Sequence, residues 1–306
     1  MGTAAVDSLN KVSIIGLGLI GSSIARGIRE VFPAVQLSGY DIDEQVRSRA
    51  GELDLAEITR SPSEAVTDAD LVILCVPVGA MATAAQSIAG ALKPAAIVSD
   101  VGSSKSSISA DLERILPGMR VVPAHPVAGT ENSGPDAGFS ALFHGRWCIL
   151  TPGAAADGEA VLMVRRFWEA LGAKIEVMDP KHHDMVLAVT SHIPHLIAFT
   201  IVGTASDLEQ VTQTEVIKYS AGGFRDFTRI AASSPVMWRD IFLANREAML
   251  DTLQRFNEDL SRLQRAIRLG DGETLLNLFS RTSAIRRGIV EQGQDTAAPD
   301  FGRPKE

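Results

Sequence analysis

The stretch KVSIIGLGLIGSSIARGIRE, residues 11–30, decides the fold of the first half of this chain. Its first five residues are mostly apolar and β-branched, as in a buried strand, and its last nine have the composition of a helix. Between them the hexapeptide GLGLIG, residues 16–21, places glycine in the pattern G-x-G-x-x-G. The pattern alone is common, but between a strand and a helix it is the fingerprint of a dinucleotide-binding turn.

Each glycine of this turn has its own physical role. Gly16 allows the tight turn, Gly18 lets the backbone approach a pyrophosphate, and Gly21 allows the helix to pack closely on the strand. The following helix offers free amide groups and the positive end of its dipole to the phosphates. We therefore predict that a dinucleotide binds the segment made of Gly16, Leu17, Gly18, Leu19, Ile20 and Gly21.

A carboxylate, Asp41, ends the second strand-like run, VQLSGYD at residues 35–41, twenty residues after Gly21. In a dinucleotide site such a carboxylate accepts both hydroxyls of the adenosine ribose and repels a 2′-phosphate. No arginine adjoins Asp41 in the sequence, and we expect Arg47 and Arg49 to be solvated helix residues. The sequence therefore predicts NAD rather than NADP as the cofactor. A plain strand-end aspartate after a structural turn is the alternative.

Strand-like and helical segments alternate through the first 178 residues. Several of the strand-like runs are apolar throughout, as are strands that crossover helices cover on both faces. The alternation predicts an α/β domain with a doubly wound, Rossmann-like, mostly parallel sheet. The carboxyl ends of its strands are expected to meet the nicotinamide near Val76, Pro77 and Asp100. The predicted strands are residues 11–15, 35–41, 70–76, 95–101, 120–124, 146–151 and 174–178.

An all-α region is predicted from Asp179 onward, where strand-like runs cease. A long helix opens at Pro180 and runs to about Ser206, and a later helix carries an apolar stripe at spacings of three and four residues. The segment DGE at 271–273 separates that helix from a last one, which ends near Val290. The stripe consists of Leu250, Leu253, Phe256, Leu260, Leu263 and Ile267.

These patterns divide the chain into three parts. Residues 1–178 are predicted to form the dinucleotide-binding domain, 179–291 a helical substrate-binding and dimerisation domain, and 292–306 a disordered tail. The helical part has more apolar surface than a domain of its size covers alone, and residues 196–203 are apolar nearly all round. Burial in a homodimer interface accounts for this surface, because obligate interfaces resemble a core cut in two. A central helix of a monomeric bundle is the alternative.

Composition excludes several classes of protein. The chain has 306 residues, of which 45% are hydrophobic and 22% charged, so it has room for two domains and is not globally disordered. Its net charge of −8 argues against nucleic-acid binding. Cys75 and Cys148 lack metal-ligand spacing, which favours a reducing compartment. The first ten residues show no signal peptide, and Pro194 and His195 interrupt the apolar segment 185–205, so we expect a cytoplasmic protein without a membrane partner.

Four polar motifs remain: DVGSSK at 100–105, AHPVAGTENSG at 124–134, SHIPH at 191–195 and GGFRDFTRIAASSPVMW at 222–238. The second begins a stretch, residues 124–138, that looks like neither a packed strand nor an amphipathic helix. Together with GLGLIG and GYD, the motifs resemble in order and spacing the prephenate/arogenate (cyclohexadienyl) dehydrogenase family of tyrosine biosynthesis. The resemblance extends to about residue 290. It implies NAD-dependent oxidative decarboxylation of prephenate and/or arogenate to 4-hydroxyphenylpyruvate and/or tyrosine.

The resemblance implies that His125 is the general base. In the family this histidine hydrogen-bonds the ring hydroxyl of the cyclohexadienol substrate and takes its proton as hydride moves from the same carbon to the nicotinamide. Loss of the ring carboxylate as carbon dioxide then aromatises the product. A neutral imidazole that titrates near the working pH suits this role. From the residues alone, a loop histidine satisfied by backbone groups is an equal alternative.

Ser103 is implied to contact both the catalytic histidine and the region between cofactor and substrate, so that its hydroxyl fixes the orientation of the imidazole. Ser104 is a neighbouring candidate, and Ser103 alternatively caps the helix that begins near Lys105.

His192 and His195 lie three residues apart and share a helical face if Pro194 is tolerated as a kink. No Glu or Cys accompanies them in a zinc-like pattern, so no metal is predicted. The resemblance assigns His195 to the substrate pocket, which His192 lines or supports. The remaining histidines match no motif and are expected at the surface; they are His144, His182 and His183.

Arg229 is implied to pair with a substrate carboxylate, because a planar guanidinium binds such a group bidentately. Arg225 is its rival, and is alternatively a structural partner of Asp226. Trp238 is expected to form a wall of the substrate pocket, and a role as a core tryptophan is an equal alternative. The other expected substrate contacts are Gly222 beside Gly223, Trp238, Thr130 and Glu131.

Two other functions remain open. The chain could be another two-domain NAD(P) dehydrogenase of the β-hydroxyacid dehydrogenase or imine reductase type, although the hydroxyacid enzymes use a lysine on the central helix, where this chain presents SHIPH. A non-catalytic NAD-sensing module predicts binding without turnover. The chain has no room for the ACT or chorismate mutase domain of some family members, so we expect any inhibition by tyrosine to act at the active site.

Overall fold

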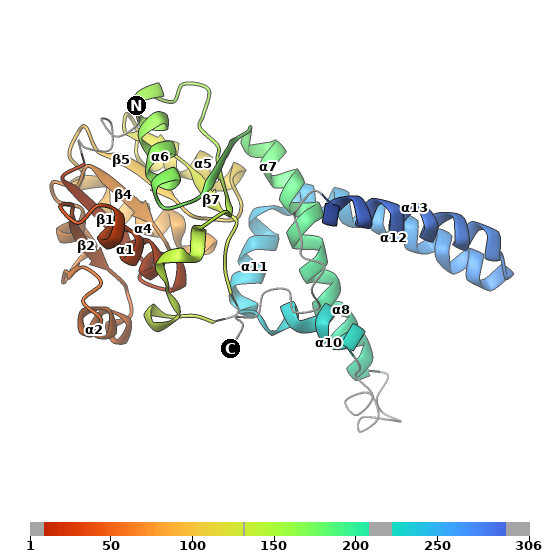
Figure 1. Ribbon diagram of the computed structural model, residues 1–306. Helices are drawn as coiled ribbons and strands as arrows, with labels where there is room; N and C mark the ends of the chain where they lie inside the picture. The colour runs from red at the N-terminus through yellow and green to blue at the C-terminus, as the bar shows by residue number, and fades with distance from the viewer. Residues whose placement is uncertain (1–8, 131, 208–221, 292–306) are drawn as a thin grey trace. The chain divides into compact units, whose positions relative to one another are not determined.

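The computed structural model describes residues 9–130, 132–207 and 222–291, with side chains as far as residue 288 (Figure 1). By compactness the chain forms two units, Met1–Leu250 and Asp251–Glu306. Within the described residues, the first unit holds both sheets and the helices up to the start of α12 (Arg246–Leu269). The second holds the rest of α12 and α13 (Gly272–Glu291). The predicted tail at 292–306 and Glu131 lie outside the described residues.

The central sheet of the first unit has six strands in the order β3-β2-β1-β4-β5-β6. Every neighbouring pair is parallel. The order reverses between β1 and β4, which is the switch point where doubly wound folds bind dinucleotides. The predicted fold class is therefore confirmed. The strands are β1 (Lys11–Ile15), β2 (Gln36–Tyr40), β3 (Glu57–Ile58), β4 (Leu71–Leu74), β5 (Ile97–Asp100) and β6 (Arg120–Val122).

Helices cover both faces of this sheet, because successive side chains of a strand point to opposite faces. Ile14 and Ile73 pack in one apolar cluster with α1 (Leu19–Val31) and α6 (Gly158–Ala170). Ile15 and Leu74, their chain neighbours, pack in the other with three further helices. These are α3 (Pro62–Val66), α4 (Met81–Ile88) and α5 (Ser106–Ile115). Burial on both sides explains why these strands are apolar throughout.

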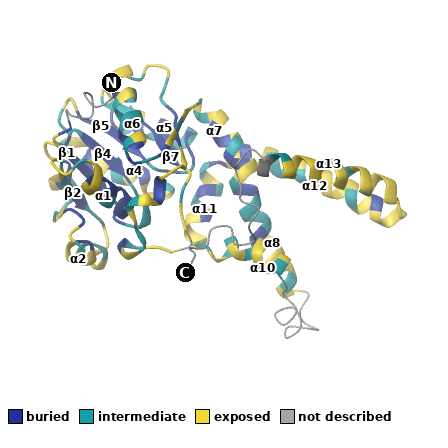
Figure 2. Ribbon diagram, viewed as in Figure 1, coloured by how far each residue is buried: buried dark blue, intermediate teal, exposed yellow. Residues whose placement is uncertain are grey.

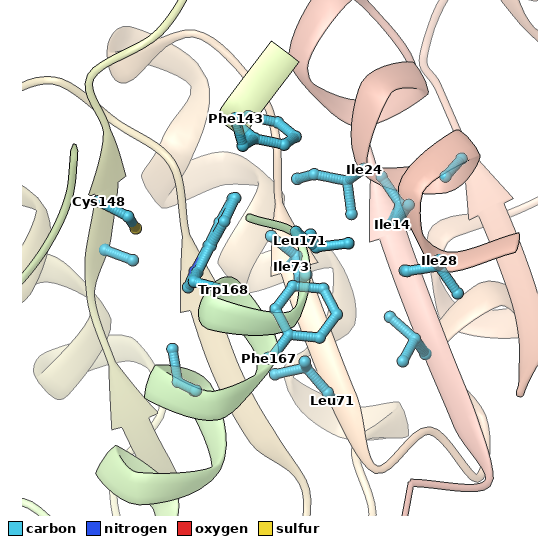
Figure 3. Packing of buried hydrophobic residues seen from close by; sticks show 14 of the residues in the cluster. Ile14, Ile24, Ile28, Leu71, Ile73, Phe143, Cys148, Phe167, Trp168 and Leu171 are labelled. Carbon is cyan, nitrogen blue, oxygen red and sulfur yellow. The ribbon is translucent and has the colours of Figure 1, made fainter. Parts of the chain in front are cut away.

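Aromatic side chains fill the core between α1 and α6 (Figure 3). The ring of Trp168 meets Phe143 edge to face at 5.1 Å between centroids, and Phe167 at 5.6 Å. All three are fully buried. Their packing anchors α6 and the short helix η4 (Ser140–Phe143) on the sheet that carries the glycine turn.

A second, three-stranded sheet corrects two expectations. It consists of β7 (Ala124–Pro126), β8 (Trp147–Leu150) and β9 (Lys174–Val177), and β7 runs antiparallel to β8. The stretch from residue 124 therefore begins as a packed strand, and the last predicted strands do not join the parallel sheet. Three residues are too few to show an alternating pattern, and the polar residues after Pro126 hide the strand further.

Five short elements complete the region before residue 179. The helix α2 follows β2, and four single turns connect the larger elements. Their bounds are α2 (Glu44–Glu52), η1 (Val78–Ala80), η2 (Ala89–Ala91), η3 (Pro135–Ala137) and η4 as given above.

One continuous helix follows, made of α7 (Pro180–Leu187), the π-turn η5 (Ala188–His192) and α8 (Ile193–Asp207). Asp179 caps it by accepting the amides of Lys181 and His182 at 2.8 and 3.2 Å. The predicted helix from Pro180 to about Ser206 is confirmed. In a regular α-helix the ring of Pro194 would collide with the carbonyl four residues earlier, and the wider π-turn provides the room for it.

By length and composition alone this helix could cross a membrane: Pro180–Asp207 has a window of mean hydropathy 1.8. Core helices of soluble proteins pass the same test. Three of its polar side chains, His183, Asp184 and His192, are buried inside the first unit. Polar side chains placed in this way indicate a helix packed on protein.

Three elements lead from the gap at 208–221 to α12: α10 (Gly222–Thr228), η7 (Arg229–Ala232) and α11 (Pro235–Ala244). The two predicted last helices are confirmed as α12 and α13. Gly270 has a left-handed φ of +66°, and the carboxylate of Asp271 accepts the amide of Thr274 at 3.0 Å, so the break lies at the expected segment. Both helices are largely exposed (Figure 2). Their exposed apolar side chains include Leu260, Ile267, Leu276 and Phe279.

Candidate active site

The glycine turn has the geometry of a dinucleotide site. Gly16 has a φ of +100°, and a Cβ there would overlap the carbonyl of Cys75, while a Cβ on Gly21 would overlap the carbonyl of Gly16. Apart from Gly18 itself and its two chain neighbours, no described residue has an atom within 4 Å of a Cβ built on Gly18. The fold therefore requires glycine at 16 and 21, and position 18 opens onto space for a ligand. The N-terminus of α1 begins directly after it.

Asp41 lies beside this turn. Its carboxylate accepts the amide of Leu17 at 2.8 Å and that of Asp43 at 3.0 Å. No arginine adjoins Asp41 in the sequence, but one does in the folded structure. Arg47 of α2 donates to the main-chain oxygen of Asp41 at 2.7 Å. That guanidinium binds the backbone and not the carboxylate, so Asp41 keeps its charge toward the turn. The residues thus fit an adenosine ribose.

Arg49, also expected to be solvated, forms an ion pair on the surface. It donates to Asp136 of η3 at 2.6 Å and to Glu52 at 2.7 Å. Arg26 of α1 donates to the carbonyl of Pro135 at 3.4 Å, and the amide of Phe139 donates to Ser23 Oγ at 3.1 Å. The loop after His125 is therefore tied to helices of the dinucleotide domain.

The predicted cofactor residues at the strand ends have different surroundings. Val76 is half-buried and Pro77 exposed where β4 ends, as the fold argument requires. Asp100 is fully buried: it pairs with Lys105 and accepts the amides of Gly102 at 2.8 Å and Ala124 at 3.3 Å. Its side chain thus belongs to a buried ion pair and not to a ligand surface.

Lys105 was not singled out by sequence, and it is the cation of that pair. Its Nζ also donates to the carbonyl of Ala124 at 2.7 Å. Burial lowers the pKa of Lys105, against the opposing effect of Asp100. The pair therefore clamps β5 to β7 immediately before His125.

His125 occupies the middle of β7 and is buried. Its Nδ1 lies 2.8 Å from Nε2 of His183, and the two rings meet edge to face. Burial, together with the neighbouring groups His183, Lys105 and His192, lowers the pKa of His125 well below its ordinary value. The imidazole is thus neutral at physiological pH, as a proton acceptor must be.

His183 was expected at the surface, and that expectation is wrong. Only His144 and His182 of that group are exposed, whereas His183 is fully buried. One signal in the sequence could have found it: Leu187 and Ala188, four and five residues later, are apolar and share a face of the long helix with His183 and Asp184.

Asp184 connects α7 to α5. Its Oδ1 accepts the amide of Lys105 at 2.7 Å and Nδ1 of His183 at 2.9 Å, and its Oδ2 accepts the amide of Ser106 at 2.8 Å. Burial alone would raise the pKa of Asp184, but hydrogen bonds from His183, Lys105 and Ser106 bring it below its ordinary value. Asp184 is therefore an anion held at the N-terminus of α5.

Ser103 does not orient His125 in the described structure, which shows no hydrogen bond between the two. Ser103 is half-buried, and the hydroxyl of Ser104 is buried without a protein partner among the described residues. The alternative, that Ser103 caps α5, also has no support, because Asp184 accepts the amides of Lys105 and Ser106.

His192 and His195 meet at Trp238. The ring of His195 stacks on Trp238 at 3.7 Å, and that of His192 meets it edge to face at 6.0 Å. We call His125, His183, His192 and His195, with Trp238, the histidine cluster. Its tryptophan is 6% exposed, so it is a buried wall between α11 and the long helix.

Hydrogen bonds fix the orientation of both rings. Asn245 Nδ2 donates to the carbonyl of Asp184 at 2.8 Å and to Nδ1 of His192 at 3.1 Å, while Nδ1 of His195 donates to the carbonyl of Ser191 at 2.8 Å. Burial lowers the pKa of His192 to about 4 and also lowers that of His195. Nε2 of His192 and Nε1 of Trp238 are buried without a partner among the described residues. Such atoms suit a polar ligand.

The remaining predicted substrate residues lie on α10, η7 and the loop after β7. Arg229 is exposed at the start of η7, close enough for its charge to lower the pKa of His195. Arg225 instead pairs with Asp226 at 3.4 Å, as the alternative reading had it. Gly222 is half-buried and Thr130 exposed.

The cofactor edge and the histidine cluster meet within the first unit. A Cβ on Gly79 of η1, just after Val76 and Pro77, would lie 2.5 Å from Oδ2 of Asp240 on α11. Trp238 lies on the same helix. A doubly wound dinucleotide domain whose strand ends adjoin a buried neutral histidine defines a two-part dehydrogenase that uses a nicotinamide cofactor.

Comparison with known families agrees with this class. The family model for the prephenate dehydrogenase nucleotide-binding domain matches residues 24–177, and that for the prephenate dehydrogenase dimerization domain matches residues 179–281. The chain therefore belongs to the prephenate dehydrogenase family and is an oxidoreductase.

Individual relatives cover nearly the whole chain. It is 47% identical over 279 residues to the cyclohexadienyl dehydrogenase of Zymomonas mobilis, covering 91% of this chain and 95% of that one. It is 33% identical over 294 residues to the prephenate dehydrogenase of Bacillus subtilis, covering 95% and 78%. The structure of Aquifex aeolicus prephenate dehydrogenase in complex with hydroxyphenyl propionate and NAD+ matches with a TM-score of 0.85 and 37% identity, covering 92% and 99%.

Proposed function

We propose that this chain is an NAD-dependent dehydrogenase that converts prephenate, arogenate or both by oxidative decarboxylation in tyrosine biosynthesis. One observation carries the proposal: a buried, neutral His125 stands between the dinucleotide domain and a cluster of polar helical side chains. The chain belongs to the prephenate dehydrogenase family and is similar to a structure of that family in complex with NAD+, which supports the choice of substrate and cofactor.

The residues act on a substrate whose ring carbon bears a hydroxyl and whose opposite carbon bears a carboxylate. His125 accepts the hydroxyl proton as the C–H bond breaks and the oxygen becomes a carbonyl. Bound NAD supplies the acceptor for the hydride. Departure of carbon dioxide returns an electron pair to the ring, and the oxygen regains the proton from His125. The net change is one hydride transferred and one carbon dioxide released.

The other predicted residues receive binding roles in the same proposal. Arg229 pairs with the side-chain carboxylate of the substrate, and His195, beside it, borders the same group. His192 and Trp238 offer their unpartnered N–H groups to substrate oxygens. Ser103, Thr130 and Gly222 are assigned to the rim of the pocket, and residues 16–21 with Asp41, Val76 and Pro77 to NAD. Glu131 is also proposed to contact the substrate.

We further propose a functional boundary at residues 178 and 179, where the two family models also meet. Compactness alone sets the boundary at Leu250, because Asp184 and Asn245 bind the helices before that residue to the sheet domain and to each other. The exposed apolar residues of α12 and α13 support a homodimer, and we also propose a cytoplasmic location. Tyrosine, which is the product from arogenate and resembles the product from prephenate, is proposed to compete at the active site.

The test is turnover. Purified protein with NAD is supplied separately with prephenate and with arogenate, and NADH formation is followed by absorbance. NADH formation with at least one substrate, accompanied by carbon dioxide release, is expected. Tight NAD binding without turnover of either would instead identify an NAD-sensing module. Tyrosine is then added, and a rise in the apparent KM at constant kcat is the expected pattern.

A further inference from the structure

We propose that His183 and Asp184 are positioning residues that fix the tautomer of His125, so that its Nε2 is the atom that accepts the substrate proton. The proposal rests on the function proposed above and adds to it which atom of the base reacts and what holds it there. It follows from the hydrogen-bonding capacity of three adjacent groups.

The first step is the state of Asp184. A carboxylate anion only accepts hydrogen bonds, and this one receives the two amides at the start of α5. The partial positive charge of that helix terminus favours the anion. The 2.9 Å contact between Asp184 Oδ1 and His183 Nδ1 therefore places a proton on Nδ1 of His183.

The second step concerns His183. Burial lowers the pKa of His183, so the ring is neutral and holds one proton, which Asp184 has already assigned to Nδ1. Its Nε2 can then only accept. The 2.8 Å bond between the two rings must be donated by Nδ1 of His125. In neutral His125 the free lone pair is consequently on Nε2.

The third step follows from the chemistry. When Nε2 of His125 takes a proton, a positive charge forms inside the protein, next to Lys105, whose charge opposes it. The bond to His183 persists in the charged ring, because Nδ1 stays a donor. Through His183 the new cation is linked to the anionic Asp184, which lowers the cost of creating a buried charge.

A purely structural role is the competing explanation, since Asp184 also joins α7 to α5. The chain offers matched variants that separate the two. His183→Leu removes both ring nitrogens and leaves the two amide bonds of Asp184 in place. His183→Gln keeps an amide oxygen that can accept the Nδ1 proton of His125. His182→Leu changes the adjacent, exposed histidine and serves as the control.

Steady-state kinetics with NAD and the better of the two substrates is the first readout. His183→Leu is expected to lower kcat about 100-fold or more, with KM for the substrate and for NAD changed less than about threefold. His183→Gln is expected to regain at least about tenfold of this loss, and His182→Leu to match the parent. A His183→Leu enzyme within about threefold of the parent kcat, or a Gln variant no better than Leu, overturns the proposal.

Nitrogen chemical shifts supply a readout that does not depend on turnover. In protein with 15N-labelled histidine, the His125 resonance is assigned by its loss in His125→Asn. The shifts are expected to show a protonated Nδ1 in the parent and in His183→Gln. A protonated Nε2 overturns the proposal even if the enzyme is fully active. If neither prephenate nor arogenate is oxidised, the proposed function fails, and the tautomer claim is still decided by this spectrum.

Discussion

The glycine turn and the histidine cluster are assembled in opposite ways. The turn is a contiguous segment, residues 16–21, and its geometry follows from three glycines between one strand and one helix. The cluster draws on β7, α7, η5, α8 and α11, and its key hydrogen bonds join residues 58 and 53 positions apart. The geometry of a contiguous motif can be predicted from the sequence, whereas that of a cluster assembled by tertiary packing cannot.

The largest expected effect tests whether the cluster contains the base. His125→Asn should lower kcat about 1,000-fold, within the range that general bases contribute, because the amide cannot take up the hydroxyl proton. The KM for substrate should change little. Initial rates of NADH formation measure both. Turnover near the parent value would place the base elsewhere and remove the cluster from the chemistry.

Arg229 tests how far the cluster extends toward the substrate. Arg229→Ala should raise KM about 10- to 100-fold, since a charge-assisted hydrogen bond contributes about 1.5–3 kcal/mol. Arg225→Ala is the matched control, because that guanidinium, four residues earlier in the chain, pairs with the adjacent Asp226. Substrate saturation curves compare them. A greater rise in KM in the Arg225 variant would assign the substrate carboxylate to Arg225 instead of Arg229.

Acid should lower the stability of the fold through the histidine cluster, whereas the glycine turn, residues 16–21, has no side chain that titrates. His192 is neutral in the folded state, with a pKa of about 4, whereas an unfolded histidine has its ordinary value near 6.5. Between these values the unfolded chain binds more protons, so stability is highest above pH 6.5 and falls as the pH drops toward 4. His192 alone should cost about 2 kcal/mol between pH 7 and pH 5. Urea unfolding at both pH values measures the loss, and His192→Gln should reduce it.

The smallest expected effect separates the two kinds of glycine in the turn. Gly18→Ala should raise KM for NAD about tenfold without changing the urea midpoint, because the new methyl group meets only the ligand space. Gly21→Ala should destabilise the fold by about 1–3 kcal/mol, since its Cβ overlaps the carbonyl of Gly16. Equal losses of stability in the two variants would contradict this assignment.

The sequence predicted the parts of the molecule that depend on short-range patterns. The first strand ends at the expected residues, and the helix from Pro180 and the break at 271–273 lie where capping and breaking residues put them. The same local reasoning brought His192 and His195 to one site, although the π-turn that makes room for Pro194 left no recognisable signal.

The residues that sequence analysis placed wrongly depend on contacts with distant parts of the chain. His183 looked like a surface histidine until packing placed His125 against it. Asp100 looked like a ligand at a strand end, but Lys105 and Ala124 enclose it. In each case the deciding contact is made in three dimensions.

The π-turn also constrains how this protein can be re-engineered. A π-turn holds one residue more than an α-turn, so deleting one residue between Ala188 and His192 would let the turn close to a regular α-helix. The ring of Pro194 would then collide with the carbonyl four residues earlier, just before His195, which stacks on Trp238. The extra residue of this turn therefore allows one helix to contain both a proline and the histidine that stacks on Trp238.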